Sequence, residues 1–237
     1  MLGPMFSALS GLRNASQRLQ NSANNVANVN TAGFKKSDVN SVDNKSGGTR
    51  VNDISRSNTQ GSLIPTGNPL DLAIDGNGFF QVTNPNGGIS FTRSGSFKQD
   101  GAGNIVDASG NALLPAVNVP GNNTGITVDS NGQISTQVGG QPVVAGQLAL
   151  ASFQNPSGLT AEGGNLFNES AGSGAPVVGN PGAGGLGTVR SGFLEGSNVD
   201  ITEEIVDQIV SKVAFKANVN VIKANDEMLG SILDIKG

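Results

Sequence analysis

The chain has 237 residues, enough for one or two domains with a hydrophobic core. Its formal net charge of -4 argues against nucleic-acid binding, which needs a basic surface. Charged residues make up 14% of the chain, against about 25% in an average soluble domain, so Asn, Ser, Thr, Gln and Gly must form much of the surface. Such a surface suits a protein surrounded by copies of itself, but a glycine-rich β domain explains it equally well.

Several kinds of chemistry and location are also excluded. The sequence lacks Cys and His, which rules out disulfides and removes the commonest general base and metal ligand. No stretch approaches the roughly 18 apolar residues of a membrane span, so we expect no membrane insertion. The first residues, MLGPMFSALSGLR, carry no basic segment before an apolar run, so we expect export, if it occurs, without a cleaved signal peptide.

Residues 5–29 are predicted to form a helix, which ends near Gly33. Apolar and small residues recur there in alternating steps of four and three, a heptad pattern typical of a helix wound around a partner helix. This apolar seam consists of Met5, Leu9, Leu12, Ser16, Leu19, Ala23 and Val26.

A second stripe on the same helix consists of amides, at Gln17, Asn21, Asn24 and Asn28. Helical geometry rotates it by about 100° from the apolar seam. Two interpretations stay open. The amides either face solvent or contact neighbouring copies of the chain, where an amide needs no matching charge but Lys or Glu would.

The middle of the chain changes character twice. Residues 35–69 are polar with few apolar anchors, which predicts a linker or extended arm. From residue 70, apolar and polar residues alternate, with Gly, Asn and Asp at short intervals, which predicts a meander of β-hairpins. One turn is expected at Asp75–Gly76, and residues 154–194 are expected to form long ordered loops. Of Phe79 and Phe80, one should enter the core while the other lies under a loop or is exposed.

Residues 197–235 are predicted to form a second, longer helix. Asn198 or Asp200 can cap its start, and acidic residues follow in the first turn, where the helix dipole favours them. Its apolar stripe has a mean step of about 3.6 residues, that of a straight helix. The stripe consists of Val206, Val210, Val213, Ala217, Val221, Ala224, Met228, Ile232 and Ile235.

These elements predict an α+β fold in which long N- and C-terminal helices pair as a coiled coil, with a central all-β domain rich in hairpins. The expected boundaries are 1–34 for the first helix, 35–69 for the linker, 70–196 for the β domain and 197–237 for the last helix. Neither terminal helix can bury its stripe alone in water, and the simplest solution is that the two pack on each other.

We find no catalytic, cofactor-binding or metal-binding residues. GNGFFQ at residues 76–81 lacks the third glycine of a dinucleotide loop, so a hairpin turn explains it better. DGAGN, DASGN and DSNGQ lack the spacing of calcium loops, and Asx turns explain them better. Acidic residues that could support glycoside hydrolysis all lie at turn signals: Asp71, Asp75, Asp107 and Asp129.

Several segments resemble the bacterial flagellar axial proteins of the rod and hook group. These are ANNVANVNTAGFKK, GNPLDLAIDGNGFFQV, TRSGSFKQDGAGNIV and GSNVDITEEIVDQIV, while GQLALASF and GNLFNESAGSGAP are most similar to the distal rod subunit. The segments cover nearly the whole chain and follow the family order. The residues that carry the motif include Asn25, Gly33, Phe34, Asp71, Gly76, Gly78, Phe79, Phe80, Ser197, Asn198 and Val199.

The resemblance implies a structural subunit of the flagellar rod, which self-assembles into a hollow helical tube and transmits torque from motor to hook. It implies a location in the periplasmic rod of the basal body and export through the flagellar channel. The implied partners are copies of the chain, neighbouring rod and hook subunits, and the surrounding ring proteins. SKVAFKANVNVIK departs from the family pattern, because Lys212 and Phe215 stand where Arg and Tyr are common.

Two alternatives remain. A hook or hook-like subunit belongs to the same structural class, although residues 70–195 leave little room for the additional outer domain of a hook protein. A peptidoglycan- or carbohydrate-active β protein belongs to a different class and is supported only by the turn carboxylates.

Overall fold

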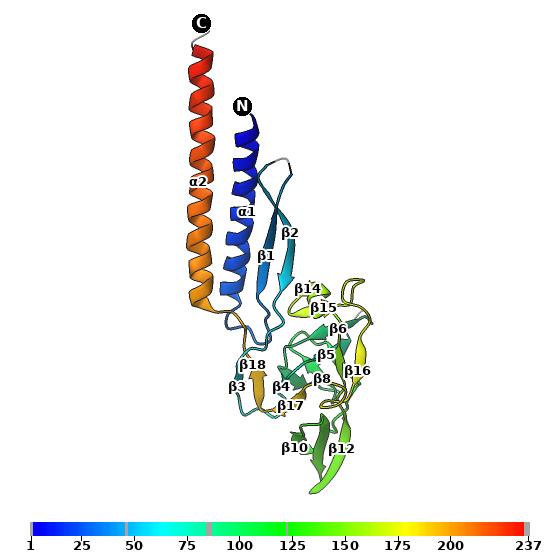
Figure 1. Ribbon diagram of the computed structural model, residues 1–237. Helices are drawn as coiled ribbons and strands as arrows, with labels where there is room; N and C mark the ends of the chain where they lie inside the picture. The colour runs from blue at the N-terminus through cyan, green and yellow to red at the C-terminus, as the bar shows by residue number, and fades with distance from the viewer. Residues whose placement is uncertain (1, 46, 84–86, 122, 235–237) are drawn as a thin grey trace. The chain divides into compact units, whose positions relative to one another are not determined.

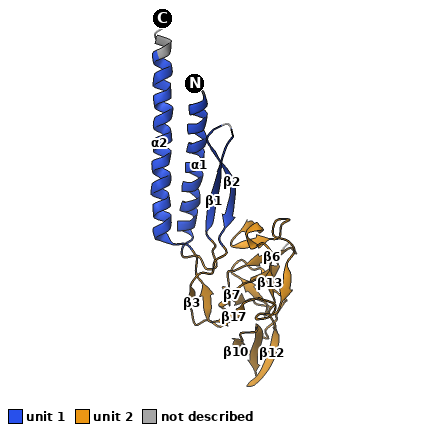
Figure 2. Cartoon of the chain, viewed as in Figure 1, with its two compact units in different colours: residues 1–29, 36–57, 199–237 blue, residues 30–35, 58–198 orange. Residues whose placement is uncertain are grey.

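The computed structural model describes residues 2–45, 47–83, 87–121 and 123–234. It divides into two compact units, coloured separately in Figure 2. The helical unit comprises residues 1–29, 36–57 and 199–237, and the β unit comprises residues 30–35 and 58–198. The predicted α+β fold is confirmed, because the terminal helices pack together and the residues between them are rich in strands.

The helical unit consists of two long helices and a hairpin (Figure 1). Helices α1 (Leu2–Ala27) and α2 (Ile201–Asp234) lie side by side. They run antiparallel, as shown by contacts of Gly11 with Asn218 near one end and of Ser22 with Glu204 near the other. Strands β1 (Ser37–Asp43) and β2 (Thr49–Arg56) form an antiparallel hairpin that packs on α1.

This hairpin lies inside the segment that we expected to be a linker or extended arm, and the expectation was wrong for residues 37–56. Val39 is buried, and Asn14 of α1 donates hydrogen bonds to the hydroxyls of Ser41 and Thr49 at 2.6 and 3.0 Å. The strands need few apolar residues of their own because α1 covers one side of the hairpin and hydrogen bonds fix its position.

The β unit is built on one large sheet whose spatial order differs from the chain order. Its strands follow the order β14–β15–β6–β5–β9–β8–β7, and β13 pairs with both β5 and β16. The bounds are β5 Phe79–Thr83, β6 Ile89–Thr92, β7 Phe97–Gln99, β8 Ile105–Asp107, β9 Ala112–Leu114, β13 Leu150–Ser152, β14 Thr160–Gly163, β15 Leu166–Asn168 and β16 Val177–Gly179. A short 3-10 helix, Pro156–Gly158, follows β13.

Smaller sheets complete this unit. One is an antiparallel meander of β10, β11 and β12, and two are pairs of strands that are distant in sequence, β4 with β17 and β3 with β18. Their bounds are β3 Leu63–Pro65, β4 Leu72–Asp75, β10 Asn123–Val128, β11 Gln133–Val138, β12 Gln141–Gln147, β17 Thr188–Ser191 and β18 Phe193–Glu195.

Two expectations about this region need correction. The turn at Asp75–Gly76 does not close a hairpin, because β4 pairs with β17 whereas β5 joins the large sheet. Gly76 instead passes close to Gly187, where a Cβ on Gly76 would lie 2.9 Å from the Gly187 Cα. Residues 154–194 contain β14, β15, β16 and β17 as well as loops. These strands are short and pair with distant partners, so their local sequence patterns are weak.

The core of the β unit has two parts. Phe80 is fully buried in the larger cluster together with Leu72, Ile105 and Leu113. Phe79, its neighbour on β5, points to the other face of the sheet, as strand geometry requires, and is also buried. There it joins a second cluster of Phe91, Ala151, Phe153, Leu159 and Phe167. Its ring makes edge-to-face contacts with Phe153 and Phe167 at centroid distances of 5.9 and 6.1 Å.

Candidate assembly surface

Helix α1 uses a face that neither predicted stripe contains. The buried or half-buried residues of this face are small or polar: Ala8, Gly11, Ala15, Ser22 and Asn25. At 100° per residue this face lies roughly 90° from the apolar seam, on the side away from the amide stripe, and roughly 130° from that stripe. Small side chains let α1 and α2 approach closely. A Cβ added to Gly11 would lie 2.8 Å from the amide of Asn218.

The matching face of α2 is also polar in large part. Its buried and half-buried positions recur in steps of four and three, the spacing of a coiled-coil seam. These positions include Glu204, Gln208, Ser211, Phe215, Asn218, Ile222, Asn225 and Leu229. The predicted pairing of the terminal helices is therefore confirmed, but most of its positions carry small or polar side chains, and the large apolar ones, Phe215, Ile222 and Leu229, are only half-buried.

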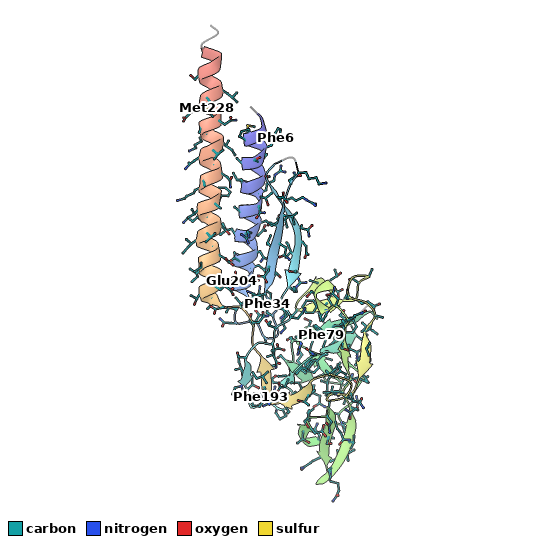
Figure 3. All side chains as sticks on the ribbon, viewed as in Figure 1. Phe6, Phe34, Phe79, Phe193, Glu204 and Met228 are labelled. Carbon is teal, nitrogen blue, oxygen red and sulfur yellow. The ribbon has the colours of Figure 1, made fainter. Side chains whose placement is uncertain are left out.

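The rest of the α2 surface exposes many large hydrophobic residues within the subunit. The large hydrophobic residues there are each about half exposed: Ile201, Ile205, Val206, Ile209, Val210, Val213, Val221 and Met228. Ala217 and Ala224 of the predicted stripe are exposed as well. The side chains of Ile232 and Ile235 lie outside the described residues. We call this set the outer apolar face of α2, and Figure 3 shows Met228 standing out from the helix near its C-terminal end.

The apolar seam of α1 likewise has little cover from its own chain. Leu9 and Leu19 are exposed, as are Ser16 and Ala23, while Met5, Leu12 and Val26 are half-buried. Phe6, which belongs to neither predicted stripe, is 60% exposed. The two predicted stripes therefore do not pack on each other within the subunit. Their proposed role in assembly remains a prediction.

Two residues of the amide stripe donate hydrogen bonds within the subunit, and the other two are exposed. Asn21 donates a hydrogen bond to the Ser37 carbonyl at 2.5 Å, and Asn28 donates one to the Asn24 carbonyl at 2.9 Å. The side chains of Gln17 and Asn24 are exposed. Contact of this stripe with other copies also remains a prediction.

A buried polar junction joins α1, β1 and α2. The Asn25 side chain accepts a hydrogen bond from the Ser37 N–H at 3.0 Å and donates to the Ser37 carbonyl at 2.9 Å and the Glu204 carboxylate at 2.8 Å. The Ser22 hydroxyl donates to the Glu204 carbonyl at 3.0 Å. Asn25 was predicted from the family motif, whereas Ser22 and Glu204 were missed. Figure 3 shows Glu204 close to the start of α2.

The start of α2 is capped by Asp200, one of the two predicted residues. Its carboxylate accepts hydrogen bonds from the N–H groups of Thr202 at 2.7 Å and Glu203 at 3.3 Å. The bond from Thr202 is the main reason that the pKa of Asp200 is lowered from its usual value. Asn198, the other candidate, instead donates from its side chain to the carbonyl and hydroxyl oxygens of Thr59.

The β unit contains a buried ionic cluster of Lys35, Arg93 and Glu195. Lys35 Nζ lies 2.6 Å from Glu195 Oε1, and Arg93 Nη1 lies 3.4 Å from Glu195 Oε2. Burial lowers the pKa of Lys35 and of Arg93, and the Glu195 carboxylate opposes both shifts. The cluster thus joins residues 30–35, the segment that follows β6 and the end of β18, which are far apart in sequence.

The remaining motif residues support this part of the β unit. Gly33 has φ of 71°, and a Cβ there would lie 2.5 Å from the Ser94 nitrogen, so a larger residue would not fit. Gly76 and Gly78 also have positive φ, and the Gly76 carbonyl accepts a hydrogen bond from Arg93 Nη2 at 2.7 Å. Asp71 is buried, and its carbonyl accepts hydrogen bonds from the residue before β18 and from the first residue of that strand. Phe34, Ser197, Asn198 and Val199 are half-buried.

The turn carboxylates have structural roles. Asp100, Asp107 and Asp129 each accept hydrogen bonds from backbone N–H groups two and four residues later, which confirms the Asx turns. Asp75 forms an ion pair with Arg190 at 2.7 Å, and Asp71 accepts a hydrogen bond from the Asn68 amide.

Two absences among the described residues bear on function. Within residues 2–45, 47–83, 87–121 and 123–234, acidic side chains do not gather in groups of three that could hold a metal ion. In the same residues, we find no helix with both the length and the apolar character needed to cross a membrane.

Comparison with known proteins identifies flagellar families along the chain. Residues 5–35 match the family described as flagella basal body rod protein, and residues 73–136 match the flagellar hook protein FlgE/F/G D1 domain. Residues 190–235 match the flagellar basal body rod FlgEFG protein C-terminal region. These matches include both terminal helices and part of the β unit.

Curated relatives point the same way. The flagellar basal-body rod protein FlgG of Buchnera aphidicola is 40% identical over 87% of this chain and 89% of that protein. FlgG of Bacillus subtilis is 35% identical over the full length of both. The flagellar hook protein FlgE of Escherichia coli is 34% identical, but over 57% of this chain and 33% of that protein. The chain therefore belongs to the family of flagellar basal-body rod proteins.

Proposed function

We propose that this chain is a structural subunit of the flagellar rod, most similar to the distal rod, and that its helical unit assembles with other copies into the wall of a hollow helical tube. Such a tube transmits torque from the motor to the hook. The observation that carries the proposal is the outer apolar face of α2, which the subunit itself leaves uncovered.

The size of this face supports an interface. Isolated exposed hydrophobic residues are common on proteins, but a contiguous apolar surface marks an interaction site. The outer apolar face includes eight large side chains that are about half exposed. Full burial of each contributes roughly 1.5–3 kcal/mol, so even partial burial against other copies would stabilise an assembly strongly. Because α1 and α2 already contact each other through mostly small and polar residues, the outer apolar face is available for other subunits.

The role that we propose is structural rather than catalytic. Its partners are copies of this chain, neighbouring rod and hook subunits, and the rings around the rod in the basal body. A rod subunit is favoured over a hook subunit because the FlgG relatives align along nearly their whole length, whereas the hook relative aligns over a third of its own.

The test combines assembly in solution with function in cells. Val206→Asp together with Val213→Asp places two carboxylates on the outer apolar face. We expect this variant to remain in the supernatant at concentrations where the wild-type chain forms sedimentable tubes. We also expect that it fails to restore motility to a bacterium lacking its distal rod subunit, while the wild-type chain restores it.

The control is Lys212→Asp, which changes the charge by the same two units at an exposed position of α2 that carries no apolar residue. Circular dichroism must show that both variants keep the helical content of the wild-type monomer. Normal tube formation by the double variant would contradict the proposed role of this face.

A further inference from the structure

The β unit contains a cavity beside its buried ionic cluster. The cavity measures about 230 Å³, and Lys35, Asn58, Phe79, Arg93 and Phe153 contribute to its lining. Since a water molecule takes up roughly 30 Å³ in the liquid, this space could hold about seven waters or a small organic group. The cavity is distinct from the outer apolar face, so binding in it does not depend on the proposed function.

The charges around this cavity do not balance. Lys35 and Arg93 bring two positive charges, both nearly fully buried, and Glu195 brings one negative charge. Among the described residues that line the cavity, none is Asp or Glu. One positive charge in a buried setting is therefore left without a partner of opposite sign, which is unfavourable unless an anion is nearby.

The two cations also have hydrogen-bond donors to spare. Of the three N–H groups of Lys35 Nζ, the structure uses one for Glu195 and one for the Thr59 carbonyl at 2.7 Å. Arg93 donates to the carbonyls of Ile74 and Gly76, but its Nε–H is buried without a hydrogen-bond partner. A buried donor without a partner carries a desolvation cost that a bound acceptor would remove.

We propose that this cavity is a binding site for a carboxylate. A carboxylate supplies the missing negative charge and acceptor oxygens that suit a guanidinium group. The rings of Phe79 and Phe153 contact the carbon atoms attached to it, while Asn58 offers a further amide donor. The carboxylate belongs either to a small free molecule or to an Asp or Glu side chain of a second copy of the chain.

The first experiment uses the full wild-type chain. In ¹H–¹⁵N spectra of the monomer, sodium acetate should shift the Arg93 Nε–H signal in a saturable way, and sodium chloride at equal ionic strength should not. Arg190, whose charge is paired with Asp75 at the surface, serves as the matched internal control and should not respond. The Arg93 signal is identified by its loss in Arg93→Lys or, if that variant does not fold, by sequential assignment of the wild-type chain.

The second experiment supplies the carboxylate within the chain. Asn58→Asp replaces a cavity-lining amide by a carboxylate of the same shape, and the Ser157 hydroxyl that now accepts from Asn58 can donate instead. We expect a higher melting temperature and an acetate affinity at least roughly tenfold weaker. A melting temperature unchanged or lower, with acetate binding retained, would count against the proposed site.

Dilution separates the two sources of the carboxylate. If a second copy supplies it, the Arg93 signal shifts as protein concentration rises without any added acetate. If a free molecule supplies it, the signal shifts with acetate alone. A wild-type Arg93 signal that responds neither to acetate nor to protein concentration would overturn the proposal.

Discussion

The helical unit and the β unit bury opposite kinds of side chain. In the β unit the two hydrophobic clusters consist almost entirely of large apolar residues, with Leu72, Phe80 and Leu150 fully covered. In the helical unit the contact between α1 and α2 buries Ala8, Ser22 and other small or polar residues, while α2 exposes its large hydrophobic residues. The difference supports the proposal that the β unit is stable within one subunit, whereas the hydrophobic stabilisation of the helical unit depends on other copies.

The largest effect on the monomer should come from the β core. Phe80→Ala would leave a cavity in a fully buried site and should lower the free energy of unfolding of the β unit by about 3–5 kcal/mol. Urea unfolding followed by NMR measures this loss. Ile89→Ala, at an exposed position of β6, is the matched control and should change it by less than about 0.5 kcal/mol. Equal losses of unfolding free energy for the two variants would contradict the conclusion that the buried core stabilises the β unit.

Shortening an exposed side chain of α2 should weaken assembly and leave the stability of the monomer nearly unchanged. Val213→Ala should leave the unfolding of the monomer nearly unchanged, because Val213 is 61% exposed there. It should raise the critical concentration for assembly about tenfold, since each buried CH₂ contributes roughly 0.8 kcal/mol and two carbons are lost. Sedimentation across a concentration series measures the shift. An equal critical concentration for wild type and variant would mean that Val213 stays exposed in the assembly.

The polar junction of the helical unit should be sensitive to the loss of one amide. Asn25→Ala removes the partner of the buried Glu204 carboxylate and of the Ser37 N–H, while the Ser37 carbonyl keeps its hydrogen bond from Asn21. Such unsatisfied groups cost about 1–3 kcal/mol, so amide hydrogen exchange of α1 and β1 should accelerate accordingly. Asn24→Ala, one residue away on the exposed surface, should leave exchange unchanged. Similar exchange in the two variants would show that the junction contributes little.

The smallest expected effects concern how unfolding depends on low pH. The pKa of Asp200 is lowered chiefly by its bond from Thr202, and that of Asp100 chiefly by its bond from the Asn104 side chain. A carboxylate whose folded pKa lies below its unfolded value stabilises the fold above the unfolded value, near 3.9, and this stabilisation is lost as pH falls through the folded pKa. Asp200→Asn should therefore make the stability of α2 alone less dependent on pH in this range. Asp100→Asn should do the same for the β unit alone. Circular dichroism at the helical minimum and NMR of the β unit between pH 5 and about 2 would separate them.

The elements of this fold follow largely from local sequence, but their contacts do not. Periodicity predicts both helices, and Gly, Asn and Asp spacing predicts the hairpins of the β unit. The face of α1 that meets α2 was missed because its signal is a run of small residues, Ala8, Gly11 and Ala15, which attracts less notice than the leucines of the apolar seam. Asn25 belongs to neither predicted stripe, and only the family motif singled it out.

Contacts between distant segments of the β unit could not be predicted. Strand β4 pairs with β17, more than a hundred residues later, and Lys35 meets Glu195 only because the intervening chain folds back. Local patterns carry no information about such partners. The hairpin at residues 37–56 was missed for a related reason, since α1 rather than its own apolar residues holds it in place.

Amide hydrogen exchange of the full chain, compared between monomer and assembled tube, tests the central claim most directly. The claim is that the outer apolar face and the apolar seam are covered only by other copies. It predicts that protection of α1 and α2 rises strongly on assembly, while the core strands around Phe80 are fully protected in both states. Helices that are already as protected in the monomer as in the tube would contradict it.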